Sequence, residues 1–245
     1  MRRRQLLAAL PASLAVTRLA APALAAEPKV LIHVPQANLT SLDPVWTTAV
    51  VTRNSAHLLF ETLYGRDEQL NPQPQMVEGH RVEDNARRWT MRLRDGLRFH
   101  TGEAVTARDC VASLKRWMVR DPIGQTIAAR LDALEAIDDR TLVWRLRKPF
   151  ASLPYALAKT QPSPVIMPER LALTDPYKQV AEFIGSGPFR WVADEYVPGS
   201  RAVFANSRNT RRGRSRRAMP PAATGCWSIA SSGRSCRTRR RRRMR

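Results

Sequence analysis

Residues 88–114 constrain the fold of this chain more than any other stretch, because they combine the patterns of a strand, two turns and a helix start. Apolar and polar side chains alternate from Trp89 to Leu93, which predicts a strand with one buried face. The dipeptides Asp95-Gly96 and Thr101-Gly102 then favour tight turns. We therefore expect a short two-stranded corner after the strand.

A helix start follows this corner. Thr106 stands three residues before Asp109, so that the hydroxyl and the carboxylate can accept each other's backbone amide hydrogen bonds at a helix N-terminus. The apolar residues after this cap share one helical face, namely Ala107, Cys110, Val111, Leu114, Trp117 and Met118. The sequence thus predicts a capped, amphipathic helix.

The run LRDGLRFHTGEAVTARDCVASL resembles the segment by which family 5 extracellular solute-binding proteins are known, the oligopeptide-, dipeptide- and nickel-binding subunits of ABC importers. The resemblance covers roughly residues 29 to 206, and one departure is His80, where the family often has Trp. Four further motifs follow the family's order: Ser41-Leu-Asp-Pro44, Leu59-Phe-Glu-Thr-Leu-Tyr-Gly65, Ile137-Asp-Asp-Arg-Thr-Leu142 and Gly185-Ser-Gly-Pro-Phe189.

Strands and helices are mixed here without a regular βαβ rhythm, which indicates an α+β or mixed α/β fold. The resemblance implies a periplasmic-binding-protein type II-like fold, of which this chain would hold the first lobe and an accessory domain and lack the second lobe. The expected divisions are 1–26, a signal peptide; 27–61, the first part of lobe I; 62–178, an accessory α+β domain; 179–207, the return to lobe I; and 208–245, an Arg-rich tail.

The start of the chain has the pattern of an export signal. Three Arg residues precede an Ala/Leu-rich stretch that ends in small residues, which predicts cleavage at Ala25 and Ala26. Arg3-Arg4-Gln5-Leu6-Leu7 fits the twin-arginine pattern, so a periplasmic location is expected. A membrane anchor is the alternative, which Pro11 and Arg18 disfavour because they interrupt the apolar stretch.

The formal net charge of +20 belongs to the two ends of the chain. Residues 1–26 contain four Arg and no acid, and residues 208–245 contain fourteen Arg and no acid, while basic and acidic residues are almost balanced between them. A nearly neutral body argues against a nucleic-acid-binding surface on the folded part.

The tail after residue 207 loses its acids and its apolar periodicity. Two explanations are open: a disordered basic arm, or a frameshift in a GC-rich gene, because out-of-frame GC-rich codons yield mainly Arg, Ala, Pro, Gly and Ser. The family resemblance favours the frameshift, since the family continues after a strand like 202–206 for roughly the same length again. The chain as written would then be a truncated product that binds solute poorly.

Catalytic and metal motifs are absent, so no enzyme activity and no cofactor are expected. The four His residues lack ligand spacing, and Cys110 is interpreted as a small core residue. Gly185-Ser186-Gly187 is interpreted as a tight turn before a strand, since a nucleophile elbow would require a helix there. Glu103 and Asp109 are interpreted as a turn residue and a helix cap.

Binding is the positive function that remains. The resemblance implies that the loop after Ser41–Pro44 faces the ligand cleft, which makes Trp46, Thr47 and Thr48 candidates, and that the segment with Lys159 and Ser163 approaches it. An aromatic ring with hydroxyls suits a peptide-like solute, and Lys159 could meet an anionic group. The expected partners are a peptide or other small solute and an ABC permease of the inner membrane, with the binding protein a monomer.

Two alternatives of other classes stay open at this point. A basic protein could bind nucleic acid through the Arg-rich tail, which salt-sensitive DNA binding would reveal. A periplasmic hydrolase would need a nucleophile or a metal constellation that the sequence does not contain.

Overall fold

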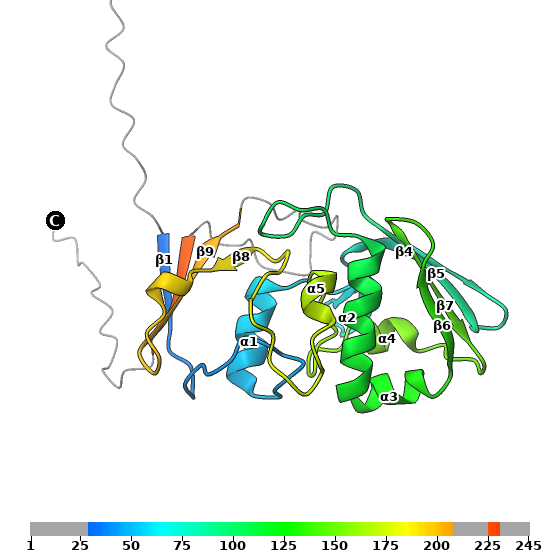
Figure 1. Ribbon diagram of the computed structural model, residues 1–245, viewed down its shortest axis with the longest axis horizontal. Coiled ribbons are helices and arrows are strands. Elements are labelled where there is room, and N and C mark those ends of the chain that lie inside the picture. Colours follow the sequence, from blue (N-terminus) through cyan, green and yellow to red (C-terminus); the bar gives the residue numbers. More distant parts are fainter. Residues whose placement is uncertain (1–28, 208–224, 231–245) are drawn as a thin grey trace, which may run out of the picture.

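Three sheets organise the part of the chain that the computed structural model describes, residues 29–207 and 225–230 (Figure 1). The first sheet draws its strands from the two ends of this part, in the spatial order β1 (Lys29–His33), β10 (Gly225–Ala230), β9 (Arg201–Asn206) and β8 (Phe189–Trp191). Only the β1–β10 pair in this sheet is parallel. A strand after Gly187 and a strand at residues 202–206 were expected, and β8 and β9 confirm both expectations.

The second four-stranded sheet is antiparallel throughout and comes from the middle of the chain. Its order is β4 (Val77–Glu83), β5 (Arg88–Leu93), β7 (Thr141–Leu146) and β6 (Leu131–Ala136). The alternation predicted for β5 is confirmed, because Trp89 and Met91 are buried while Arg88 and Arg92 are exposed. Trp89 pairs with Trp144 of β7, so two indoles stand side by side on the buried face.

A small two-stranded sheet joins β2 (Tyr64–Arg66) and β3 (Pro72–Pro74). The two prolines of β3 do not prevent this segment from pairing with β2 in an antiparallel register. Proline is tolerated in a strand at a sheet edge, where a missing N–H costs no interior hydrogen bond.

The longest helix, α2 (Ala107–Arg120), begins with the predicted capping box. The Thr106 backbone N–H donates to Asp109 Oδ2 at 2.7 Å, and the Asp109 N–H donates to Thr106 Oγ1 at 3.4 Å. The other helical segments are α1 (Val50–Leu59), α3 (Pro122–Ala128), α4 (Leu153–Leu157), α5 (Glu169–Ala172) and the 3-10 turn η1 (Ala193–Glu195). In the described ranges, no helix has the length and apolar character needed to cross a membrane.

The Gly185-Ser186-Gly187 segment is not the tight turn that the sequence suggested. Gly185 and Ser186 form no assigned turn, and a bend at Gly187 and Pro188 leads into β8. The Gly187 N–H donates to the carbonyl of Leu59, at the C-terminal end of α1, at 2.8 Å. A Cβ atom at Gly185 would lie 2.1 Å from the same carbonyl oxygen. Glycine is therefore needed for a close backbone approach rather than for a turn.

Part of the Arg-rich tail has regular structure, so disorder of the whole tail, one of the two explanations left open by the sequence, does not describe residues 225–230. Residues 225–230 form β10 between β1 and β9. The local sequence Cys-Trp-Ser-Ile contains β-favouring residues and no charge, and the average composition of the tail conceals this short run. The predicted cleavage site at Ala25 and Ala26 and the other residues of the tail lie outside the described residues.

Candidate functional site

A buried ion pair between Asp43 and Arg116 anchors the loop that follows β1. The side chains are 0% and 1% exposed, and Arg116 of α2 donates to both carboxylate oxygens, at 3.1 and 2.7 Å. The guanidinium also donates to the carbonyls of Thr174 and Lys178, at 3.2 and 2.9 Å. This bidentate, charge-assisted contact ties the loop to α2 and to the segment after α5.

Asp43 also orders the backbone around it. Its Oδ1 accepts hydrogen bonds from the N–H groups of Val45 and Trp46, at 3.0 and 3.2 Å, and its Oδ2 accepts one from Val180 at 3.1 Å. With these donors, both oxygens of the buried Asp43 carboxylate have hydrogen-bond partners in the protein. The acidic residue of the Ser41–Pro44 motif therefore acts as the structural anchor of the loop.

The loop beyond this anchor presents two of its three candidate residues to solvent. The Trp46 side chain is 38% exposed and Thr48 is exposed, whereas Thr47 is half-buried. Thr47 Oγ1 accepts the Ala49 N–H at 3.3 Å, one residue before α1 begins. The Thr47 hydroxyl thus orders the loop, and Trp46 and Thr48 form its outer surface.

Gln161 joins this loop to the second candidate segment. Its Nε2 donates to the Thr48 carbonyl, and its Oε1 accepts from Arg53 Nη1 at 2.8 Å. The two segments lie 113 residues apart in the sequence, so only the tertiary fold brings them together. Sequence reasoning missed both Gln161 and Arg53, since neither belongs to a recognisable motif.

Lys159 and Ser163 do not stand free at this surface. The Lys159 ammonium pairs with the Asp121 carboxylate, which is fully buried and caps α3 through the N–H groups of Ile123 and Gly124, at 2.8 and 2.9 Å. Ser163 is 1% exposed, and its hydroxyl has no hydrogen-bond partner among the described residues. Of the two, only Lys159 reaches the surface, with its charge already compensated.

An exposed aromatic and an arginine lie beside the Trp46 loop. Arg120 Nη2 donates to the Trp46 carbonyl at 3.1 Å, and the Arg120 guanidinium carbon lies 4.7 Å from the centroid of the Tyr177 ring. The Tyr177 side chain is 64% exposed. This cation–π contact places a second aromatic ring near the loop, and no motif in the sequence pointed to it.

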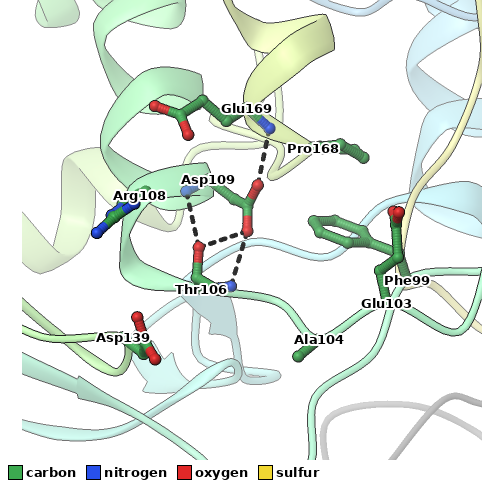
Figure 2. A pocket seen from close by; sticks show the side chains of 9 residues that line it. All are labelled: Phe99, Glu103, Ala104, Thr106, Arg108, Asp109, Asp139, Pro168 and Glu169. Atoms are coloured by element: carbon green, nitrogen blue, oxygen red, sulfur yellow. Dashed lines mark hydrogen bonds between the residues drawn. The ribbon is translucent and has the colours of Figure 1, made fainter.

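A cavity of about 360 Å³ opens at the start of α2 (Figure 2). Its central acid, Asp109, accepts from Thr106 Oγ1 at 2.7 Å and from the Glu169 backbone N–H at 2.7 Å, in addition to the cap described above. These contacts join α2 to α5 and occupy both carboxylate oxygens. The interpretation of Asp109 as a helix cap is thus confirmed, because structural hydrogen bonds engage both oxygens of its carboxylate.

Burial in the folded core shifts the pKa values of two other groups, Glu61 and Cys110. Burial raises the pKa of Glu61 to about 7, against weaker opposing effects from Ser186, Arg94 and Gln75. Burial likewise raises the pKa of the Cys110 thiol far above its usual range, so that the thiol stays protonated. Within the described ranges, no group of three or more His, Cys, Asp or Glu side chains could hold a metal ion.

Comparison with protein families shows which family the chain belongs to. Residues 71–212 match the family model described as "Bacterial extracellular solute-binding proteins, family 5 Middle", which is more than half of the chain. The chain belongs to this family. Membership confirms the resemblance seen in the sequence, and it favours solute binding over nucleic-acid binding through the tail.

Relatives of this family-5 chain are named as binding proteins, one of them as part of a peptide ABC transporter. It is 42% identical over 174 residues to the "Probable peptide ABC transporter periplasmic-binding protein y4tO" of Sinorhizobium fredii, covering 71% of this chain and 32% of that protein. It is 26% identical over 168 residues to the "Glutathione-binding protein GsiB" of Escherichia coli K12, covering 65% and 32%. The chain thus spans about a third of the length of these curated relatives.

Solved structures support the same fold for this family-5 chain. NikA from Brucella suis, solved in complex with Fe(III)-EDTA, superimposes with a TM-score of 0.68 at 17% identity, covering 83% of this chain and 39% of NikA. The mixed helix-and-strand architecture therefore corresponds to a part of a periplasmic-binding-protein fold, as the sequence led us to expect.

Proposed function

We propose that this chain is the first lobe and accessory domain of a periplasmic solute-binding component of an ABC importer that captures peptides. The similarity to the y4tO protein, named as a probable peptide transporter component, supports the solute class. The basic start followed by an apolar stretch supports export, by the twin-arginine route in our proposal. The proposal includes boundaries between lobe I and the accessory domain at residues 61/62 and 178/179. It also includes a monomeric state and an ABC permease of the inner membrane as the partner.

One observation carries the proposed binding surface. Gln161 bonds to the Thr48 carbonyl, so the segments 46–48 and 159–161 contribute to one surface with an exposed Trp46 ring. An indole can cover an apolar peptide side chain, while the Thr48 hydroxyl and the Arg53 guanidinium offer hydrogen bonds to peptide groups. A second lobe closing over this surface would complete the site.

The test is peptide binding by a chimera in which residues 1–206 are joined to the C-terminal remainder of the y4tO protein. Isothermal calorimetry with a set of di- to pentapeptides is expected to detect saturable binding. Trp46→Ala should weaken that binding by about tenfold, because a central aromatic contact is lost. Val82→Ala, a change at a 42% exposed apolar residue on β4, is the matched control and should leave binding unchanged.

The proposal fails if the folded chimera binds none of the peptides. If Trp46→Ala and Val82→Ala change the peptide affinity of the chimera equally, the surface around Trp46 is not the binding site. We expect the chain as written to bind the same peptides more weakly than the chimera, because one side of the site alone cannot exclude water from the ligand.

We also keep the proposal that residues 208–245 are an out-of-frame ending. Sequencing the gene across codons 200–215 tests it. If no other frame beyond codon 206 encodes a continuation similar to family 5 proteins, the frameshift is refuted. The strand at 225–230 does not bear on this question, because any uncharged β-favouring run could pair with the open edges of two neighbouring strands such as β1 and β9.

A further inference from the structure

A second cavity, of about 380 Å³, opens between β2, α3 and α4. Arg66 comes from β2, Ile123 from α3, and Tyr155 and Ala156 from α4, with Lys159 just beyond that helix. The volume is within the range of roughly 300–1,000 Å³ that is typical of small-molecule sites. Of these residues only Lys159 belongs to the segments proposed above for peptide capture.

Apolar side chains with unused surface line the groove. Ile123 is 40% exposed and Tyr155 is 51% exposed, although both border a concave site. The Phe150 ring is held by the Arg130 guanidinium, whose carbon lies 5.5 Å from the ring centroid. Tyr155 is oriented by a hydrogen bond from its hydroxyl to Asn71 Oδ1 at 3.3 Å. A flat apolar molecule would bury this surface at a gain of roughly 25 cal/mol per Å².

The charge of the groove is positive and concentrated on Arg66. The lining includes two cations and no acid. Lys159 is compensated by Asp121, whereas none of the ion pairs in the described part of the chain involves Arg66. Arg66 Nε donates to the Ala158 carbonyl at 2.9 Å, which holds the side chain against the end of α4. The guanidinium is thus oriented in advance for an acceptor in the groove.

We propose that this groove binds a small organic anion that consists of a carboxylate on a flat apolar body. The carboxylate pairs with the Arg66 guanidinium, which is suited to the planar geometry of that group. The apolar body lies against Tyr155, Phe150 and Ile123, and the hydroxyls of Ser152 and Thr126 border it. This ligand class and this place are separate from the proposed peptide surface.

The test uses the whole chain and a matched pair of probes, indole-3-acetate and the neutral indole-3-acetamide. Ligand-observed NMR titration is expected to show that the acid binds about tenfold more tightly than the amide, the factor expected for one charge-assisted hydrogen-bonded contact. Arg66→Gln should remove this preference, with the affinity of the acid falling about tenfold to that of the amide. Arg81→Gln, a change at an arginine with a 78% exposed side chain on β4, is the matched control and should change neither affinity.

Equal binding of the acid and the amide by the unmodified chain would overturn the proposal, as would an Arg66→Gln variant that keeps the preference. If Arg66→Gln fails to fold, Tyr155→Ala provides the second variant, and it should weaken both probes because it removes apolar surface of the groove and leaves Arg66 in place. Unchanged affinity of both probes for a folded Tyr155→Ala variant would also refute the site. Failure of the chimera to bind peptides leaves this experiment unaffected, because the probes and the residues differ.

Discussion

The two four-stranded sheets contain similar apolar strands in opposite surroundings. In the second sheet, Trp89 and Trp144 are buried, and α2 packs over β6 and β7. In the first sheet, β1 leaves Val30, Leu31 and Ile32 exposed, at 56%, 44% and 56%. Figure 1 shows β1 at the far end of the molecule from α2.

This difference shows that an apolar sequence alone does not make a strand buried. Consecutive apolar residues are typical of a strand that is covered on both faces. In the described ranges β1 pairs on one edge with β10, and its exposed side chains show that neither face is covered. The apolar sequence of β1 is thus typical of a covered strand, but no described residues cover it. The second sheet, in contrast, is covered by α2. The following predictions test this contrast, beginning with the largest expected effect.

Trp144→Ala should be the most destabilising change, at about 3–5 kcal/mol, because it empties the centre of the covered sheet. Urea unfolding followed by circular dichroism measures the loss. Trp144→Phe is the matched control: the indole N–H of Trp144 has no partner among the described residues, so a phenyl ring should cost far less. Equal losses for the two variants would mean that the covered sheet is not the stability core.

Arg116→Met should cost about 3 kcal/mol, because it leaves the buried Asp43 carboxylate without its counter-charge. The backbone donors of Val45, Trp46 and Val180 keep this loss at the lower end of the range for broken buried pairs. Urea unfolding again gives the value. Since this pair ties α2 to the loop after β1, the variant should also make that loop more susceptible to limited proteolysis, while the second sheet stays protected. Uniform cleavage across both sheets would contradict the contrast.

Glu61 lies between the two regions, at the end of α1 and 3.9 Å from Arg94 after β5. Its pKa of about 7 is raised above the ordinary value of 4.5, so the folded state holds the proton more tightly than the unfolded state. Its contribution to stability is therefore complete below pH 4.5 and is lost as the pH rises through 7. The loss amounts to roughly 3 kcal/mol between pH 4.5 and pH 8.

Glu61→Gln tests this linkage, because glutamine cannot titrate. Relative to the unmodified chain, the variant should become more stable by that same amount as the pH is raised from 4.5 to 8, measured by urea unfolding at each pH. Burial lowers the pKa of His100 and gives a pH dependence of opposite sign, which cancels in this comparison because both proteins contain it.

Leu31→Ser should have the smallest effect on stability, within about 0.5 kcal/mol, because the side chain is already in water. The same change should reduce self-association, since an exposed apolar edge strand is an aggregation hazard. Light scattering at increasing protein concentration measures this. A large loss of stability would show that β1 is covered in solution.

Much of the fold follows from local patterns. The alternation in β5, the cap at Thr106 and the turns at Gly96 and Gly102, which have φ of 69° and 94°, depend on residues close in sequence. The strand at 225–230 was missed because composition was averaged over the whole tail. The Gly185–Gly187 segment was misjudged because its constraint comes from Leu59, far away in the sequence.

In the candidate site too, local sequence predicted some features and tertiary contacts decided the others. The sequence pointed to the loop at residues 46–48 through the motif before it, but it could not show that Asp43 anchors that loop through Arg116 of α2. It also could not assign Gln161 a role, place Ser163 in the interior, or reveal that Lys159 already has a partner in Asp121.

By itself the sequence determined the family, the mixed architecture and the local caps and turns, because these depend on periodicity and on neighbouring residues. The tertiary structure alone decided which apolar strand is covered, which charges are compensated and which distant loops share a surface. Burial and ion pairing depend on contacts between residues tens of positions apart, and no local pattern encodes such contacts.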